Sequence, residues 1–259
     1  MTAACTLVGS TPTRAGAEPV RVAIQFSIDG DLRFVSHRDE LRLLTRALAR
    51  ARWPVAYSQG FNPQPRVVLP LPRSVGTAST CEWAVVVLNE SRATERLQRS
   101  LAAALPSGCC LQRVVTLATR ATPHAQRARY TVELDPADTR GIQPRIEELL
   151  RAVTLDIERG YGAKKPSRAI NIRPYIETVT LDGRTLSMQL TFTGQRTARP
   201  IELLTALSLP STEYGHRIRR VQVEWDIELA GPTGRSPSAE RNNVGQEESC
   251  NAPPQERET

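Results

Sequence analysis

Hydrophobic and polar residues recur along the chain in a pattern that predicts a strand, a helix, two extended segments, a second strand, a second helix and a third strand. Arg21–Ile28 alternates polar and apolar residues and ends at a turn over residues 29–31, which is typical of a half-buried strand. Ser36 is predicted to cap a helix with Asp39 as its capping-box-like partner, and Pro54 ends that helix. The remaining expected elements are extended segments at Val55–Ser58 and Val67–Leu69, a strand at Cys81–Leu88, a helix at Thr94–Leu105 and a strand at Cys110–Leu117.

The second half repeats this order with an inserted hairpin that turns at Asp182-Gly183. Its expected elements are strands at Tyr130–Leu134 and Leu155–Arg159, hairpin strands at Ile170–Thr180 and Leu186–Thr193, helices at Pro144–Val153 and Pro200–Leu207, and a last strand at Ile218–Trp225. The order predicts an α+β fold of two tandem, duplicated ferredoxin-like split β-α-β units with antiparallel sheets. Their expected limits are residues 20–121 and 122–229.

Both ends of the chain are poor in large apolar side chains. Residues 1–19 and 230–259 are rich in glycine, proline, serine, threonine, asparagine and glutamate, so we expect two disordered tails. No apolar run approaches the ~18 residues that a membrane-spanning helix needs, and no basic segment precedes an apolar stretch near the start. The sequence therefore predicts a cytoplasmic protein with no membrane partner.

The five cysteines show no metal-binding spacing, and only three histidines could join them. We therefore expect reduced structural thiols, no metal and no cofactor in this chain. The charge is uneven: 34 Lys+Arg face 27 Asp+Glu, and residues 21–123 carry 14 arginines against 7 acidic residues. That net +7 favours a surface for a polyanion, although a GC-rich codon usage would also enrich arginine.

The segment from Gly30 to Arg66 carries a resemblance to a known family. Its matching features are Leu32-Arg33-Phe34, Ser36-His37, Asp39, Arg46-Ala47-Leu48 and the run Ala56–Pro63, with later matches at Pro70-Leu71, Gly76, Glu82, Lys164-Lys165, Asn171–Pro174, Arg199-Pro200 and Leu203-Leu204. With these, the chain resembles the radical-SAM-linked protein family, a domain of unknown function found beside, or fused to, cobalamin-binding-type radical SAM proteins. Arg38 departs from that family's usual apolar residue, and Arg66 replaces a common lysine. The resemblance implies a separately encoded radical SAM protein as partner.

Two features of this segment suit binding to phosphates and unpaired bases. Arg38, Arg42, Arg46 and Arg50 recur at i+4 spacing, a row that either binds phosphate or is a solvated helix face. Tyr57–Pro63 mixes aromatic and hydrogen-bonding side chains and suits stacking on bases, whereas a purely structural turn would pack Phe61 into the core.

Two further candidates are a histidine and a basic loop. His37, at the first turn of the predicted helix, is a weak candidate for an acid–base group. The alternative is that His37 has a purely structural role and makes a hydrogen bond. The loop Gly160–Arg168 holds Lys164 and Lys165, lacks the Walker spacing, and is either a phosphate contact or a generic loop.

We therefore expect a non-catalytic accessory or substrate-binding module of a radical SAM system that binds RNA or another phosphate-bearing substrate. The alternatives are an enzyme acting on a nucleotide-like small substrate with His37 as acid–base group, and a protein-interaction scaffold for the radical SAM partner. One continuous basic surface is expected to be bordered by the Tyr57–Pro63 loop, by Lys164 and Lys165, and by the arginines Arg42, Arg46 and Arg50. The expected binding residues are Arg33, His37, Arg38, Arg42, Arg46, Arg50, Tyr57, Ser58, Gln59, Gly60, Phe61, Asn62, Arg66, Lys164 and Lys165.

Overall fold

A computed structural model describes residues 19–160, 167–194 and 196–227 of the 259-residue chain. The tails predicted at 1–19 and 230–259 therefore lie outside the described residues, apart from Pro19. The first half contains β1 (Val20–Ile28), the 3-10 helix η1 (Gly30–Phe34), α1 (His37–Arg50), β2 (Val67–Val68), β3 (Ala78–Leu88), α2 (Thr94–Ala102) and β4 (Cys109–Thr116).

The second half is built from short helices and strands in a similar order. It contains β5 (Ala125–Glu133), α3 (Pro136–Thr139), α4 (Ile142–Arg151), β6 (Asp156–Arg159), β7 (Arg168–Asn171), η2 (Arg173–Tyr175), β8 (Ile176–Asp182), β9 (Thr185–Thr191), α5 (Pro200–Ala206), α6 (Ser211–Tyr214), η3 (Gly215–Arg217) and β10 (Arg219–Trp225). Within the described ranges, no helix is long and apolar enough to cross a membrane.

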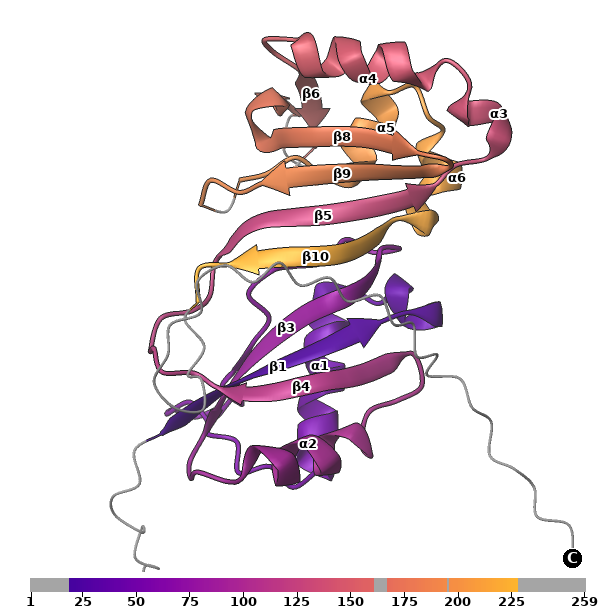
Figure 1. Cartoon of the computed structure of the whole chain (residues 1–259). Coiled ribbons are helices and arrows are strands. Elements are labelled where there is room, and N and C mark those ends of the chain that lie inside the picture. Colours follow the sequence, from indigo (N-terminus) through magenta and orange to yellow (C-terminus); the bar gives the residue numbers. More distant parts are fainter. Residues whose placement is uncertain (1–18, 161–166, 195, 228–259) are drawn as a thin grey trace, which may run out of the picture.

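Strands from both halves form one large sheet, which makes the fold a mixed α+β fold (Figure 1). The order is β4-β1-β3-β10-β5-β9-β8, with β2 paired to β3. The neighbours are antiparallel except β3 and β10, which run parallel and pair only at Arg219 with Ala78 and Arg220 with Ser79. The two halves are therefore joined through a short parallel contact in the middle of the sheet.

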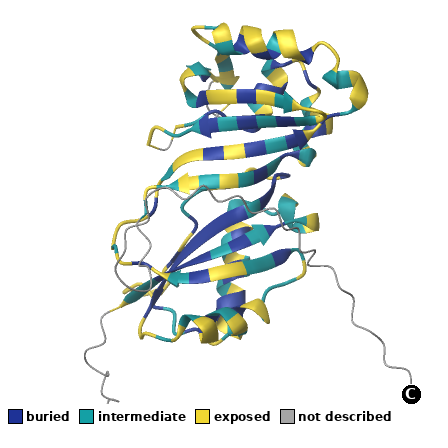
Figure 2. Ribbon diagram, in the orientation of Figure 1, coloured by how far each residue is buried: buried dark blue, intermediate teal, exposed yellow. Residues whose placement is uncertain are grey.

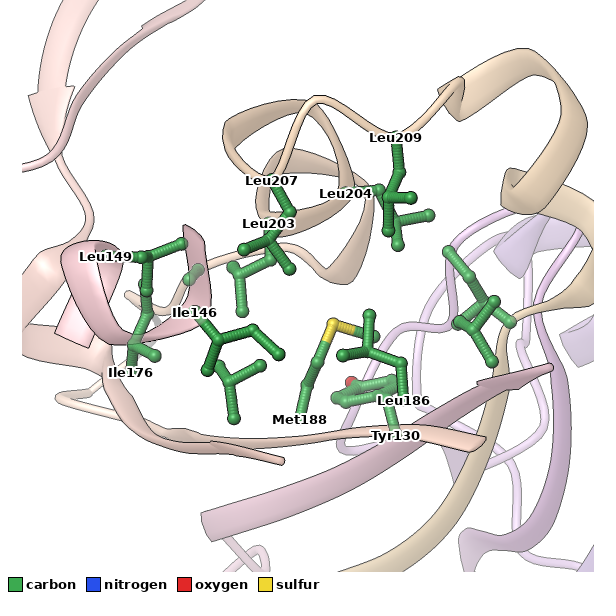
Figure 3. Packing of buried hydrophobic residues seen from close by; sticks show 14 of the residues in the cluster. Tyr130, Ile146, Leu149, Ile176, Leu186, Met188, Leu203, Leu204, Leu207 and Leu209 are labelled. Carbon is green, nitrogen blue, oxygen red and sulfur yellow. The ribbon is translucent and has the colours of Figure 1, made fainter. Parts of the chain in front are cut away.

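Each half buries its own apolar core between the sheet and its helices (Figure 2). In the first half, Leu44 and Leu48 of α1 and Leu97 of α2 pack on Ile24 and Val86 of the sheet. The second core is formed by leucines of α5, by α4 and by the inward side of β5, β8 and β9 (Figure 3). A small third cluster, Ala23, Trp83, Val85 and Leu117, lies on the opposite face of the first half.

The predicted strand Ile170–Thr180 is wrong, because the chain breaks there into two strands of different sheets. β7 pairs with β6 in a separate two-stranded sheet, and β8 joins the large sheet. Between them, the Asn171 side chain accepts hydrogen bonds from the backbone N–H groups of Leu155 and Arg173, and Pro174 lacks the N–H that a ladder needs. The predicted turn at 29–31 also differs, since Asp29 caps η1 there.

Candidate functional site

The predicted arginine row lies on the outward side of α1. Ser36 caps this helix as expected, with its hydroxyl accepting from the Asp39 N–H at 3.2 Å and donating to the Asp39 carboxylate. That bond, together with the hydrogen bond and charge of Arg42, holds the pKa of Asp39 below its ordinary value. All four arginines of the row, Arg38, Arg42, Arg46 and Arg50, are exposed.

Only part of this positive charge is neutralised by the chain. Arg42 pairs with Asp39 at 2.9 Å, and Arg50 donates to the backbone carbonyl of Ala104, just beyond the end of α2. Arg38 and Arg46 make no hydrogen bond or ion pair with any described residue. These two guanidinium groups keep their donors available for an anion.

The Tyr57–Pro63 segment is a loop that is fixed at its base and exposed at its tip. Tyr57 bridges Pro65, the Ser58 N–H donates to the Gln64 carbonyl, and the Gln64 N–H donates to the Ser58 hydroxyl. At the tip, Gln59, Gly60, Phe61 and Asn62 are all exposed. The structural alternative, with Phe61 in the core, is therefore wrong.

The two aromatic side chains of this loop face solvent. Phe61 is 112% exposed and Tyr57 is 52% exposed. Gly60 has φ +128°, a conformation that favours glycine, and a Cβ there would meet nothing within 4 Å. Arg66 leaves the loop next to β3, where its N–H donates to the Ala56 carbonyl and its carbonyl accepts from Val87. The loop thus projects from the sheet edge where β2 pairs with β3.

His37 and Arg33 lie at the other end of β3 from this loop. α1 begins beside Ala78, because Arg73 bonds both Glu40 and the Thr77 carbonyl, whereas Val55 bridges Leu88. The strand between Ala78 and Leu88 spans roughly 33 Å at ~3.3 Å per residue. His37 and the Tyr57–Pro63 loop are therefore anchored at opposite ends of the first half. The predicted binding residues Arg33 and His37 lie at one end, and those of the loop lie at the other.

Arg33 has a structural role at this end. Its guanidinium donates to Asp29 at 2.7 Å, to the Gly30 carbonyl and to the His216 carbonyl of the second half. His37 is half-buried, and its Nδ1 is buried without a hydrogen-bond partner among the described residues. The structure brings Arg33 to the contact between the halves.

Two buried ion pairs, which the sequence pattern does not predict, lie close to that contact. Arg73 donates to Glu40 at 3.0 Å, with side chains 1% and 2% exposed. Arg220 of β10 holds Glu82 of β3 through Nε at 2.9 Å and through a terminal nitrogen to both carboxylate oxygens. Burial and the neighbouring Glu82 carboxylate raise the pKa of Glu40, against the effect of Arg73. The available signal was Glu82, a lone acid in an otherwise uncharged strand.

The remaining predicted features concern metals and the lysine loop. The described residues contain no cluster of three or more histidine, cysteine or acidic side chains able to hold a metal. Burial raises the pKa of Cys81 to about 11 and that of Cys109 to about 12. Lys164 and Lys165 lie outside the described residues, so the single basic surface stays a prediction.

Comparisons with known proteins identify a family and add two weak structural similarities. The crystal structure of an unknown protein from Galdieria sulphuraria has 15% identity and a TM-score of 0.22, covering 83% of this chain and 100% of that chain. The acetolactate synthase small subunit from Thermotoga maritima has 8% identity and a TM-score of 0.23, covering 82% and 98%. The curated proteins contain no significant match.

The family assignment covers the first half and most of the second. Residues 21–200 match the family described as "Uncharacterized protein conserved in bacteria (DUF2344)". The match includes α1 with its arginines, the Tyr57–Pro63 loop and both acids of the buried ion pairs. The chain therefore belongs to this bacterial family of uncharacterized proteins.

Proposed function

We propose that this chain is a non-catalytic, RNA-binding accessory module of a cytoplasmic radical SAM system. The observation that carries the proposal is the Tyr57–Pro63 loop, which is hydrogen-bonded at its base and exposes two aromatic side chains to solvent. Covering the exposed ring of Phe61 removes apolar surface from water, which is favourable, and the flat face of an unpaired base can stack on that ring.

Arginine charge on α1 and directly after the loop supports a nucleic acid over an apolar partner. Arg38 and Arg46 on α1 have no ion-pair partner among the described residues, and Arg66 follows the loop directly. Guanidinium groups bind phosphate oxygens in a bidentate geometry, and each neutralised phosphate releases counterions. Ring stacking supplies contact with bases, while the arginines supply contact with the backbone.

The strand orders support the finer fold proposal, two ferredoxin-like units in tandem. In the first half, β4-β1-β3 continues to β2, and in the second half the order is β10-β5-β9-β8. Each half therefore has the strand order 4-1-3-2 when its strands are counted along the chain, with β6 and β7 as an insertion. Folds of this β-α-β-β-α-β type include sheets that bind unpaired RNA bases.

The radical SAM partner rests on the sequence resemblance, which places such proteins beside this family. Co-purification from a bacterium that carries both genes tests it, with a tag on this chain. We expect the neighbouring radical SAM protein in the eluate, and its absence after mild cross-linking would contradict this part of the proposal.

A gel shift that compares single-stranded with duplex RNA of equal nucleotide number tests RNA binding. We expect tighter binding of the single strand, because its bases are free to stack on Phe61 and Tyr57. Phe61→Ala should remove most of that preference, whereas Val153→Ala, which changes an exposed apolar residue of the second half, should not. Equal affinity for both RNAs, or no shift with either, would overturn the proposal.

A further inference from the structure

A hollow lies on the face of the sheet opposite the helices of the first half, between β1, β3 and β4 and the β10 strand of the second half. A cavity of about 310 Å³ is lined by Gln25, Cys81, Trp83, Arg113, Val221, Gln222, Val223, Trp225 and Ile227. Its volume is at the lower end of the range for small-ligand pockets, which suits a single planar ring system. None of these residues belongs to the set predicted from sequence.

Strand register explains why these side chains share one face. Val22 pairs with Val86 and both lie in the core beneath α1 and α2, so the next positions point to the opposite face. Gln25 pairs with Trp83 on β3 and with Arg113 on β4. In Figure 1, α1 passes behind these strands, and no helix in the described part of the chain packs on this side.

The walls of the hollow are aromatic and cationic. The rings of Trp83 and Trp225 lie 6.1 Å apart, with an angle of 52° between their planes. The guanidinium carbon of Arg113 lies 5.5 Å from the centre of the Trp83 ring. The Nε of Arg113 donates to Gln25 at 2.6 Å, which fixes the guanidinium plane. Its two terminal nitrogens make no hydrogen bond with the described residues and remain available as donors.

A second donor in the hollow lacks a partner. The indole Nε1 of Trp225 is buried and makes no hydrogen bond with any described residue. An indole nitrogen can only donate, and leaving such a donor buried without an acceptor is costly. A ligand with a carbonyl oxygen or an aromatic ring nitrogen would satisfy it.

Two further cations lie along the same face. Arg21 pairs with Val87 in the β1–β3 register, so it shares the face of Gln25, about 13 Å away at ~3.3 Å per residue. Arg66 lies beside the same β3 residue as Arg21, because the Val87 N–H donates to the Arg66 carbonyl and Val87 pairs with Arg21. Burial and the charge of Arg66 lower the pKa of Arg21. Neither forms an ion pair with a described acidic residue. A chain of phosphates leaving the hollow would meet both.

We propose that this hollow binds one base of single-stranded RNA, stacked against the indoles and Arg113, with the adjoining phosphates directed toward Arg21 and Arg66. Bases offer the flat face that an indole and a guanidinium stack on, and their carbonyl oxygens and ring nitrogens accept from Trp225 and Arg113. The inference rests on the proposed RNA binding and adds a second contact on the sheet, separate from the Tyr57–Pro63 loop.

Tryptophan fluorescence tests this site directly, because two of the three tryptophans line it. Trp53 lies in the first-half core beneath α1 and α2, where its Nε1 donates to Ser100. In Trp53→Phe, the fluorescence therefore comes from Trp83 and Trp225 alone. Titration of this variant with a single-stranded RNA should quench its emission saturably. Arg113→Gln in the same background should weaken the fluorescence-derived affinity by about 5- to 50-fold, from the loss of one stacking contact and one charge.

The affinity of a labelled RNA, followed by fluorescence anisotropy, separates this site from the loop. Trp225→Phe keeps a ring but removes the N–H, and should weaken binding about 3- to 10-fold, as expected for one hydrogen bond. Arg151→Gln, which changes an exposed arginine on α4, serves as the control and should have no effect. Trp83 is part of the packed cluster and is left unchanged.

The outcomes distinguish the two proposals. RNA binding that depends on Phe61 but leaves tryptophan emission and both site variants unchanged would overturn the hollow as a base site and leave the proposed function standing. Quenching by a nucleoside monophosphate with no quenching by RNA would also overturn it. Absence of RNA binding by the unmodified chain would overturn both.

Discussion

Arg220→Met should destabilise the protein strongly, because Arg220 and Glu82 form a buried pair between the halves. Their side chains are 2% and 3% exposed, and three nitrogen–oxygen contacts between 2.5 and 2.9 Å join them. Removing one member leaves Glu82 buried without its cation and near Glu40. Breaking such a pair costs about 3–5 kcal/mol, against a total stability of about 5–15 kcal/mol for a typical protein.

A double-mutant cycle separates the charge effect from the loss of packing. In Glu82→Leu with Arg220→Met, neither charge remains, so we expect recovery of at least ~2 kcal/mol relative to Arg220→Met alone. Urea unfolding followed by tryptophan fluorescence gives the free energies, and Arg151→Met, at an exposed ion pair, should leave the midpoint nearly unchanged. A cost below about 1 kcal/mol for Arg220→Met, or additive costs in the double variant, would refute the reasoning.

Three further predictions concern the loop, a surface carboxylate and the thiols. Phe61→Ala should leave the urea midpoint unchanged, because the ring is fully exposed, yet lower RNA affinity by about 1–3 kcal/mol, measured by anisotropy. Burial alone would raise the pKa of Asp29, but hydrogen bonds from Arg219 and the Gly30 N–H hold it below the ordinary value of 3.8. The ionised carboxylate therefore stabilises the fold above pH 3.8 and loses this effect as the pH falls through the lower folded-state pKa. In urea unfolding, Asp29→Asn should be less stable than the wild type at pH 7 and equally stable in acid. An equal loss of stability at both pH values would contradict this. Cys81 and Cys109, buried and with raised pKa values, should react with a maleimide at pH 7 far more slowly in the folded than in the unfolded chain by peptide mass mapping, and rapid labelling of either in the folded chain would contradict the packing.

Local signals in the sequence were enough to predict most elements and the loop around Gly60. Ser36 caps α1 because its hydroxyl reaches an N–H three residues on, and that geometry is encoded within four residues. The composition around Gly60 predicts the loop, because prolines and a glycine disfavour regular structure there. The Asp182-Gly183 signal predicts the hairpin between β8 and β9 for the same kind of local reason, and the two turn residues there are Gly183 and Arg184.

Contacts between residues far apart in the chain could not be read in this way. Glu82 and Arg220 are separated by 138 positions, and nothing near either residue indicates the other. The hollow that joins Gln25, Arg113 and Trp225 depends on the register of strands from both halves and on the crossing of β10 beside β3. Alternation placed these side chains on a face, but strand pairing decided which ones meet.

The dependence of RNA affinity on salt tests the central claim most directly. Anisotropy of a labelled single-stranded RNA, measured between 50 and 200 mM salt, should give an affinity that falls linearly on logarithmic axes. Replacing Arg38 and Arg46 together by glutamine should reduce that slope by about 1.4, at ~0.7 for each phosphate contact on a single strand, while Phe61→Ala should lower the affinity without changing the slope. An affinity that does not respond to salt, or a double variant that keeps the full slope, would contradict RNA binding through this surface.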